Sequence, residues 1–225
     1  MRSAVKLLSA ALLIGVLPPA LASGSGMMPQ SMPRVETPEQ QARDLFNDGV
    51  GYVKKADKAD AEAAQASDAG KKARAQKDAQ ARYTSALGKL EQSLQRNPQM
   101  PEAWNYFGYT SRKLGNYADA LGAYEKALAL RPGYPDAIEY RGEAFLGVNR
   151  PEDAKQAYLD LFAGNRALAD KLLAAMKAWV ATQRATPSVS DTASVDELDK
   201  WIQERSQISA QTAALTRAGT AAAWR

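Results

Sequence analysis

The stretch that decides the fold is Pro101–Pro135, "PEAWNYFGYTSRKLGNYADALGAYEKALALRPGYP". Large and small residues recur in it at spacings that suit two short antiparallel helices. Large side chains would fill the space between the helices, and small ones would let the two backbones approach each other. Gly115 can take the left-handed conformation that ends a first helix, and a proline would stop the second. The landmarks are Trp104, Phe107, Gly108, Ala120, Tyr124, Ala127 and Pro132.

These landmarks resemble the signature of the tetratricopeptide repeat, a 34-residue unit that folds as a helix pair. Counted from Pro101, large residues occupy places 4, 7 and 24, and small residues occupy places 8, 20 and 27. The resemblance implies an all-α solenoid of antiparallel helix pairs. We expect about three pairs, followed by a C-terminal capping helix.

A second copy of the pattern precedes the first. Seven residues recur after 34 positions, and a shared register of this length rarely arises by chance. The upstream residues are Tyr83, Ala86, Leu87, Gly88, Glu91, Leu94 and Pro98, and their counterparts are Tyr117, Ala120, Leu121, Gly122, Glu125, Leu128 and Pro132. The sequence therefore predicts a unit over residues 37–100, ahead of the unit over residues 101–134.

The first unit contains an insertion over residues 54–80. Thr37 to Gln40 form a capping box that starts its first helix, and Gly49 takes place 8. The insertion is rich in Ala and mixed charges, which favours helix, and Ser67–Gly70 is a good turn. We expect both helices to be about three turns longer than usual and to project as a hairpin. The hairpin could be a docking arm or an oligomerisation coil, and a merely solvated hairpin is the simpler alternative.

The chain after the second unit follows the pattern less closely. A third unit over residues 135–166 keeps large or small residues at five places but departs at Arg141, Leu161 and Arg166. Residues 167–184 have the apolar periodicity of a capping helix. Residues 185–225 are expected to be a linker, a short helix over 194–205 and a loose tail. The retained residues of the third unit are Ile138, Gly142, Phe145, Ala154 and Tyr158.

Residues 1–22 have the features of a secretory signal peptide. A charged start precedes a short apolar run and the cleavage motif Ala20-Leu21-Ala22. The run is too short to cross a bilayer core of about 30 Å. We therefore expect an exported protein without stable membrane insertion, in the periplasm or, alternatively, outside the cell. Residues 23–36 are expected to be a disordered linker, and its three Met residues are more simply part of a tail than a Cu(I) site.

The composition excludes most familiar catalytic sites. The 225 residues include no Cys and no His, so thiolate nucleophiles and histidine bases or ligands are absent. The formal net charge of +4 would fall to about +2 once Arg2 and Lys6 leave with the signal peptide, which is too small to indicate binding to nucleic acid or to anionic lipid. Glu139 and Glu143 are four residues apart, as paired carboxylates can be, but no nucleophile or phosphate loop accompanies them. We expect no catalysis, no cofactor and no metal.

The resemblance also implies a binding groove, lined by the first helix of each pair. The repeat positions that face the groove in the family are occupied in this chain by seven polar or aromatic residues and by Leu146. Family members that hold a peptide's terminal carboxylate use cations at such places, whereas this chain has Glu139 and Glu143. An acidic and aromatic groove favours a basic or extended peptide. The candidate groove residues are Glu102, Asn105, Tyr109, Arg112, Asp136, Glu139 and Glu143.

Two hypotheses of function follow. The first is a scaffold or adaptor of the bacterial cell envelope that binds a protein or peptide partner in the groove. The alternative is a structural subunit that assembles with itself through the hairpin or the C-terminal helix. Such a subunit would form a homo-oligomer. Gly88 and Gly122 share place 22, where close local packing is the simplest explanation for a glycine inside a helix.

Overall fold

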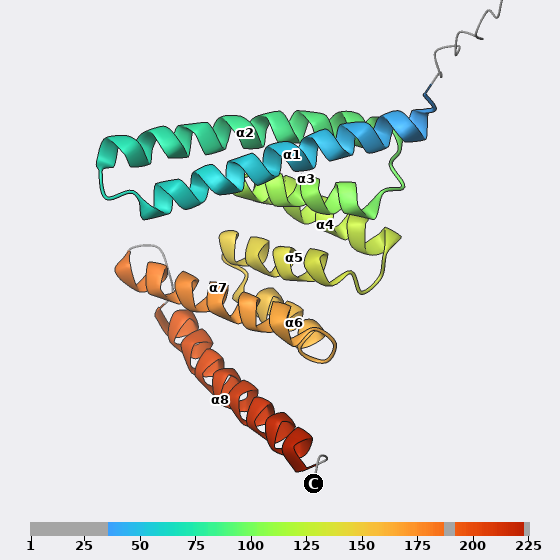
Figure 1. Cartoon of the computed structure of the whole chain (residues 1–225). Coiled ribbons are helices and arrows are strands. Elements are labelled where there is room, and N and C mark those ends of the chain that lie inside the picture. The colour runs from blue at the N-terminus through green and yellow to red at the C-terminus, as the bar shows by residue number, and fades with distance from the viewer. Residues whose placement is uncertain (1–35, 187–191, 223–225) are drawn as a thin grey trace, which may run out of the picture. The chain divides into compact units, whose positions relative to one another are not determined.

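The computed structural model describes residues 36–186 and 192–222, and all of its regular structure is helical. Predictions for the signal peptide, the linker to Val35 and the three linker Met residues lie outside this range. Figure 1 shows helix pairs stacked in chain order. The helices are α1 (Pro38–Gln65), α2 (Ala69–Arg96), α3 (Pro101–Lys113), α4 (Tyr117–Leu130), α5 (Pro135–Gly147), α6 (Pro151–Phe162), α7 (Arg166–Ala185) and α8 (Thr192–Ala222).

The predicted all-α fold of tetratricopeptide type is confirmed, and local signals placed most of the helix ends. The Thr37 backbone N–H donates to the Gln40 side chain at 2.9 Å, and the Gln40 backbone N–H donates to the Thr37 hydroxyl at 3.2 Å. This reciprocal capping box starts α1. Gly115 has a φ of 85°, which ends the first helix of the second pair in the left-handed region.

Glycines in the first helices allow close packing. A Cβ built on Gly49 would lie 2.8 Å from Leu90, and one on Gly108 would lie 2.6 Å from the ring of Tyr124. A Cβ on Gly142 would meet Leu172 of α7 at 2.6 Å. Trp104 and Phe107, by contrast, are only half-buried, so they do not fill the interior of their pair as Tyr124 does.

The first pair is the long hairpin that the insertion predicts. Its helices have 28 residues each, against 13 and 14 in α3 and α4. Alanines form the buried seam between the two long helices. The buried Ala residues are Ala42, Ala56, Ala59, Ala63, Ala79 and Ala86.

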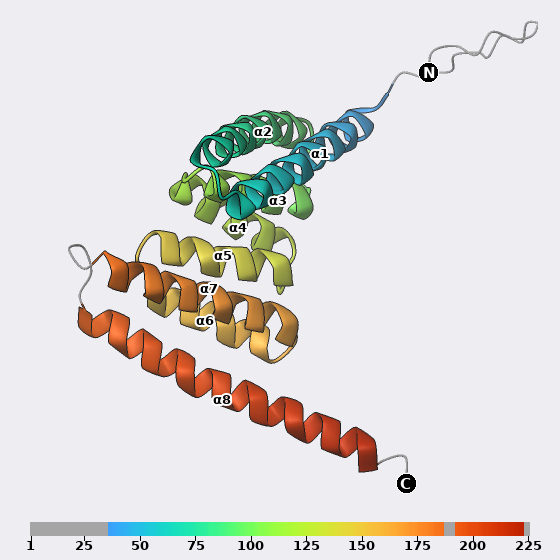
Figure 2. The same ribbon diagram turned by 60° about the vertical axis from the view of Figure 1, so that its left-hand side comes forward.

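The C-terminal part differs from the prediction. Helix α8 spans 31 residues, where a short helix over 194–205 and a loose tail were expected. It packs on α7, so α7 belongs to a fourth helix pair and is not a terminal cap (Figure 2). Leu198 and Ile202 are buried in the core that α8 shares with α6 and α7. Arg166 donates to the Ser209 hydroxyl at 3.3 Å, and these contacts extend the helix beyond the expected end.

Two helical glycines provide a matched test of the packing. Gly108→Ala should lower the free energy of unfolding by about 1–3 kcal/mol, because the new methyl group meets the buried Tyr124 ring. Gly122→Ala should raise it by about 0.5–1 kcal/mol, because no atom lies within 4 Å of its Cβ position and alanine favours helix. Urea unfolding followed by circular dichroism measures both. Equal changes in the two variants would contradict this account of the packing.

Candidate protein-binding face

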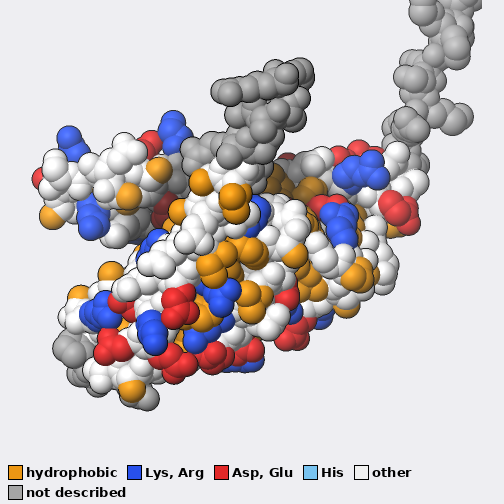
Figure 3. All heavy atoms as spheres, turned by 90° about the horizontal axis from the view of Figure 1, so that it is seen from below, with side chains coloured by type: hydrophobic (Ala, Val, Ile, Leu, Met, Phe, Trp, Pro, Cys, Tyr) orange, Lys and Arg blue, Asp and Glu red, His pale blue; other side chains and the backbone are white. Residues whose placement is uncertain are grey.

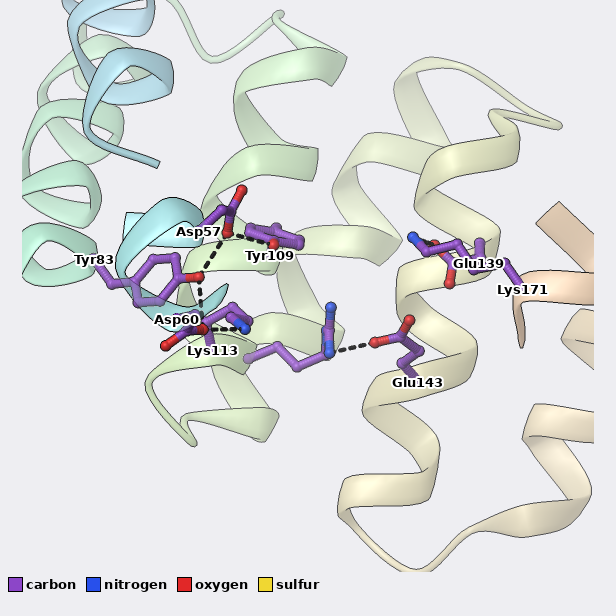
Figure 4. Close-up of polar contacts among 9 residues, drawn as sticks. Asp57, Asp60, Tyr83, Tyr109, Lys113, Glu139, Glu143 and Lys171 are labelled. Carbon is purple, nitrogen blue, oxygen red and sulfur yellow. Dashed lines mark hydrogen bonds and ion pairs between the residues drawn. The ribbon is translucent and has the colours of Figure 1, made fainter. Parts of the chain in front are cut away.

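The candidate groove residues lie on α3 and α5, which belong to the layer of first helices α1, α3, α5 and α7. Neighbours in this layer contact each other. Each of these helices contributes charged or phenolic side chains to contacts between units, as Figure 4 shows. The layer was expected to be an open acidic surface. The contacts described next show that much of its charge is already neutralised.

A line of four titratable groups joins α3, α5 and α7. The Lys171 ammonium donates to the Glu139 carboxyl group at 2.8 Å. Glu143 lies one helical turn after Glu139 and forms an ion pair with Arg112. The guanidinium of Arg112 also lies over the rings of Tyr109 and Tyr140, 5.4 and 5.6 Å from their centroids. The line therefore bridges three successive units.

A second cluster joins the hairpin to α3. The Tyr83 and Tyr109 hydroxyls donate to Asp57 at 2.6 and 2.7 Å, and Tyr83 also lies 3.1 Å from Asp60. Lys113 forms an ion pair with Asp60. Burial, followed by the hydrogen bond to Asp57, raises the pKa of both phenols. The two phenols remain protonated donors, so the cluster fixes the hairpin on the second unit.

These contacts correct part of the predicted groove. Glu139 has 0% relative exposure and Leu146 has 5%, so neither is presented on an open surface. Glu143 and Arg112 neutralise each other, and Glu102 pairs with Arg131. The groove is therefore less acidic than expected. The physical reason is that cations on neighbouring helices contact these carboxyl groups. The repeat pattern does not predict these cations.

Asn105, Tyr109 and Asp136 have other surroundings. Asn105 is 3% exposed, and its Oδ1 accepts no hydrogen bond among the described residues. Its side chain lies beside Tyr134, whose pKa is raised by burial and only partly lowered by the amide. Tyr109 and Asp136 are half-buried. Next to Asn105, the ring of Tyr106 packs edge-to-face on Phe46 with centroids 5.7 Å apart.

A hollow of about 440 Å³ lies elsewhere, between α2, α3 and α4. Trp104 and Phe107 line it, and the Lys126 ammonium lies 4.1 Å from the Trp104 ring centroid. Gly122 also lines it, which explains why no atom packs on this glycine. The expectation of close local packing is therefore wrong for Gly88 and Gly122, because neither has an atom near its Cβ position.

The described residues offer no metal centre, since no group of three or more carboxylates converges in them. None of the described helices is long and apolar enough to cross a membrane. The sequence analysis missed five residues of the inter-unit contacts. Nothing in the repeat pattern marks them, because their partners come from other helices. They are Asp57, Asp60, Lys113, Tyr140 and Lys171.

A comparison with protein families agrees with the helix-pair geometry of α3 and α4. Residues 101–134 match the family described as tetratricopeptide repeat. A comparison with curated proteins found no match. Among solved structures, the chain is similar to "First TPR of Spaghetti (RPAP3) bound to HSP90 peptide SRMEEVD". That match has 21% identity and a TM-score of 0.47, and it covers 64% of this chain and 97% of that chain.

The buried Glu139 predicts a pH-dependent stability. Burial, and then the neighbouring Glu143, raise the pKa of Glu139 to about 8 against the opposing effect of Lys171. Between the ordinary carboxyl pKa and this value, the folded state keeps a proton that the unfolded state has lost. The free energy of unfolding should therefore fall as pH rises through this window, by up to about 1.4 kcal/mol per pH unit.

Glu139→Gln should remove this contribution, because glutamine cannot ionise. Urea unfolding at pH 5, 6, 7 and 8 measures the slope. Glu125→Gln is the control, since Glu125 is exposed on α4 and its substitution should keep the wild-type slope. A Glu139→Gln protein with an unchanged slope would refute the assignment.

Proposed function

We propose that this chain is a non-catalytic scaffold that binds a protein or peptide partner. The partner would lie on the first-helix layer, at the end formed by α1, α3 and α5. The observation that carries this proposal is the pair of half-buried rings of Tyr106 and Tyr134, both of which lie near the Asp136 carboxylate. Aromatic rings that the chain covers only in part offer large anchors that a partner can bury.

The charges at the end of the layer formed by α1, α3 and α5 are consistent with an extended peptide segment as the partner. Glu102 is engaged by Arg131, whereas Asp136 forms no ion pair among the described residues. A segment that crosses here would meet aromatic rings and one available carboxylate. An extended peptide with an apolar or aromatic side chain and a nearby basic side chain fits this set. Such a ligand needs no terminal carboxylate.

A photo-crosslinking experiment tests the proposed face. A photoreactive residue at position 106 should capture a partner from the envelope fraction, and the same residue at position 159 should not. Leu159 is 42% exposed and lies on α6, outside the first-helix layer. Equal capture at both positions would contradict the location.

Titration calorimetry with the captured partner then tests the rings. Tyr106→Ala should weaken binding about 5- to 30-fold, because truncating an aromatic anchor costs about 1–2 kcal/mol. Gln207→Ala shortens an exposed side chain on α8 and should leave the affinity unchanged. An unchanged affinity in the Tyr106→Ala protein would exclude this contact.

We also propose that the scaffold works in the bacterial cell envelope, after residues 1–22 direct its export and are removed. The short apolar run and the motif Ala20-Leu21-Ala22 support this proposal. Mass spectrometry of the protein from the periplasmic fraction should give a chain that begins at Ser23. An uncleaved chain in the cytoplasm would overturn the proposal.

A further inference from the structure

The end of the α1–α2 hairpin carries unbalanced positive charge. Four exposed cations lie in the first turns of α2, and among the described residues none of them forms an ion pair. They equal in number the formal net charge of the whole chain, +4. Figure 3 shows the hairpin end as a lobe at the upper left with several blue side chains. The four cations are Lys71, Lys72, Arg74 and Lys77.

The acidic residues near the tip are already engaged. Asp68 caps α2 by accepting from the Lys71 backbone N–H at 2.7 Å. Asp78 pairs with Arg82 at 2.8 Å, and Glu62 lies 3.9 Å from Lys58. Residues 62–78 contain three carboxylates, Glu62, Asp68 and Asp78, against the four cations, so the end of the hairpin keeps a net positive charge.

The arrangement of the cations limits the shape of an anionic partner. At 100° per residue, the four side chains spread over about 220° of the helix circumference. A hollow of about 560 Å³ between α1 and α2 is lined by only two of them, Lys71 and Arg74. A narrow acidic polypeptide bound on one side of the hairpin would not contact the other two cations. A wider anionic surface at the end of the hairpin would reach more of them.

The neutral residues of the tip exclude other partners on chemical grounds. Between Glu62 and Asp78 the uncharged residues are Ala, Gln, Ser and Gly alone. Protein interfaces depend on a few large buried anchors, usually Trp, Tyr or Arg within a packed centre. Single-stranded nucleic acid needs aromatic rings for base stacking. The tip offers charge without such anchors, and charge suffices only at a dense anionic surface.

We propose that the hairpin end binds an anionic lipid surface through Lys71, Lys72, Arg74 and Lys77. The contact is peripheral, because no large apolar side chain is present to insert. Each basic residue near such a surface strengthens binding about fivefold, so four of them suffice for reversible attachment. This site is separate from the proposed partner face and does not depend on it.

Vesicle sedimentation tests the proposal with residues 23–225, which contain every described helix. At 50 mM salt the protein should sediment with phosphatidylglycerol–phosphatidylcholine vesicles and remain in solution with pure phosphatidylcholine. The tip variant replaces Lys72, Arg74 and Lys77 by Glu, and it should bind at least 100-fold more weakly. The control variant carries the same change in net charge at three exposed cations that form no ion pair among the described residues, and it should keep most of the affinity. Its substitutions are Arg43→Glu, Lys177→Glu and Lys200→Glu.

Circular dichroism establishes that both variants are folded, and a tip variant with Ala at the same three positions provides a second test that favours the helix. Equal losses in the tip and control variants would overturn the proposal, because binding would then follow net charge alone. If the wild-type protein binds polyglutamate but does not bind anionic vesicles, the lipid proposal is overturned and an acidic polypeptide is the partner. Equal binding to neutral vesicles would show that the cations do not direct the contact.

Discussion

The close approach of a glycine in one helix to a large side chain of another sets the spacing of this solenoid. Gly108 lies against the ring of Tyr124, Gly49 against Leu90, and Gly142 against Leu172 of the next pair. Interiors at this density do not deform gradually, so each contact fixes how far apart two helices lie. The positions of polar side chains on the same helices follow from these distances. Both the Asp57 cluster and the Arg112–Glu143 pair therefore depend on the packing at these glycines.

The polar contacts of the first-helix layer add a second level of organisation. In repeat proteins each unit contacts only its neighbours, so the interfaces between units determine the curvature. Here those interfaces include charged pairs and shared phenols from Asp57 on α1 to Lys171 on α7. Side chains used in this way are not free for a partner. This division of roles leaves the half-buried rings of Tyr106 and Tyr134 as the part of the layer suited to recognition.

Much of the fold could be predicted from the sequence because its determinants are local. The capping box at Thr37, the turn at Gly115 and the 34-residue period each depend on nearby residues. The long hairpin followed from the Ala-rich insertion by helix propensity alone. Helix α8 was underestimated because its stability also comes from contacts with α7, such as Arg166 with Ser209, which are 43 residues apart.

The candidate site was harder to predict for the same reason. The position of a residue within the repeat correctly predicted which helices carry the candidate binding face and several of the residues on it. It could not show that Lys171, 32 residues away, would neutralise Glu139, or that Asp57 in the insertion would engage Tyr109. Burial of Glu139 depends on the fourth pair, which the repeat pattern does not specify. The position of a residue within the repeat therefore predicted where its side chain lies better than it predicted which groups that side chain contacts.

The short connection between α1 and α2 has a consequence for the order of folding. Only Ala66–Asp68 separate the two 28-residue helices, so bringing them together closes a very small loop. Contacts that are local in sequence form faster than distant ones. The first pair also precedes the others along the chain and buries its alanine seam without them. It can therefore form early, and offer a finished surface on which α3 assembles.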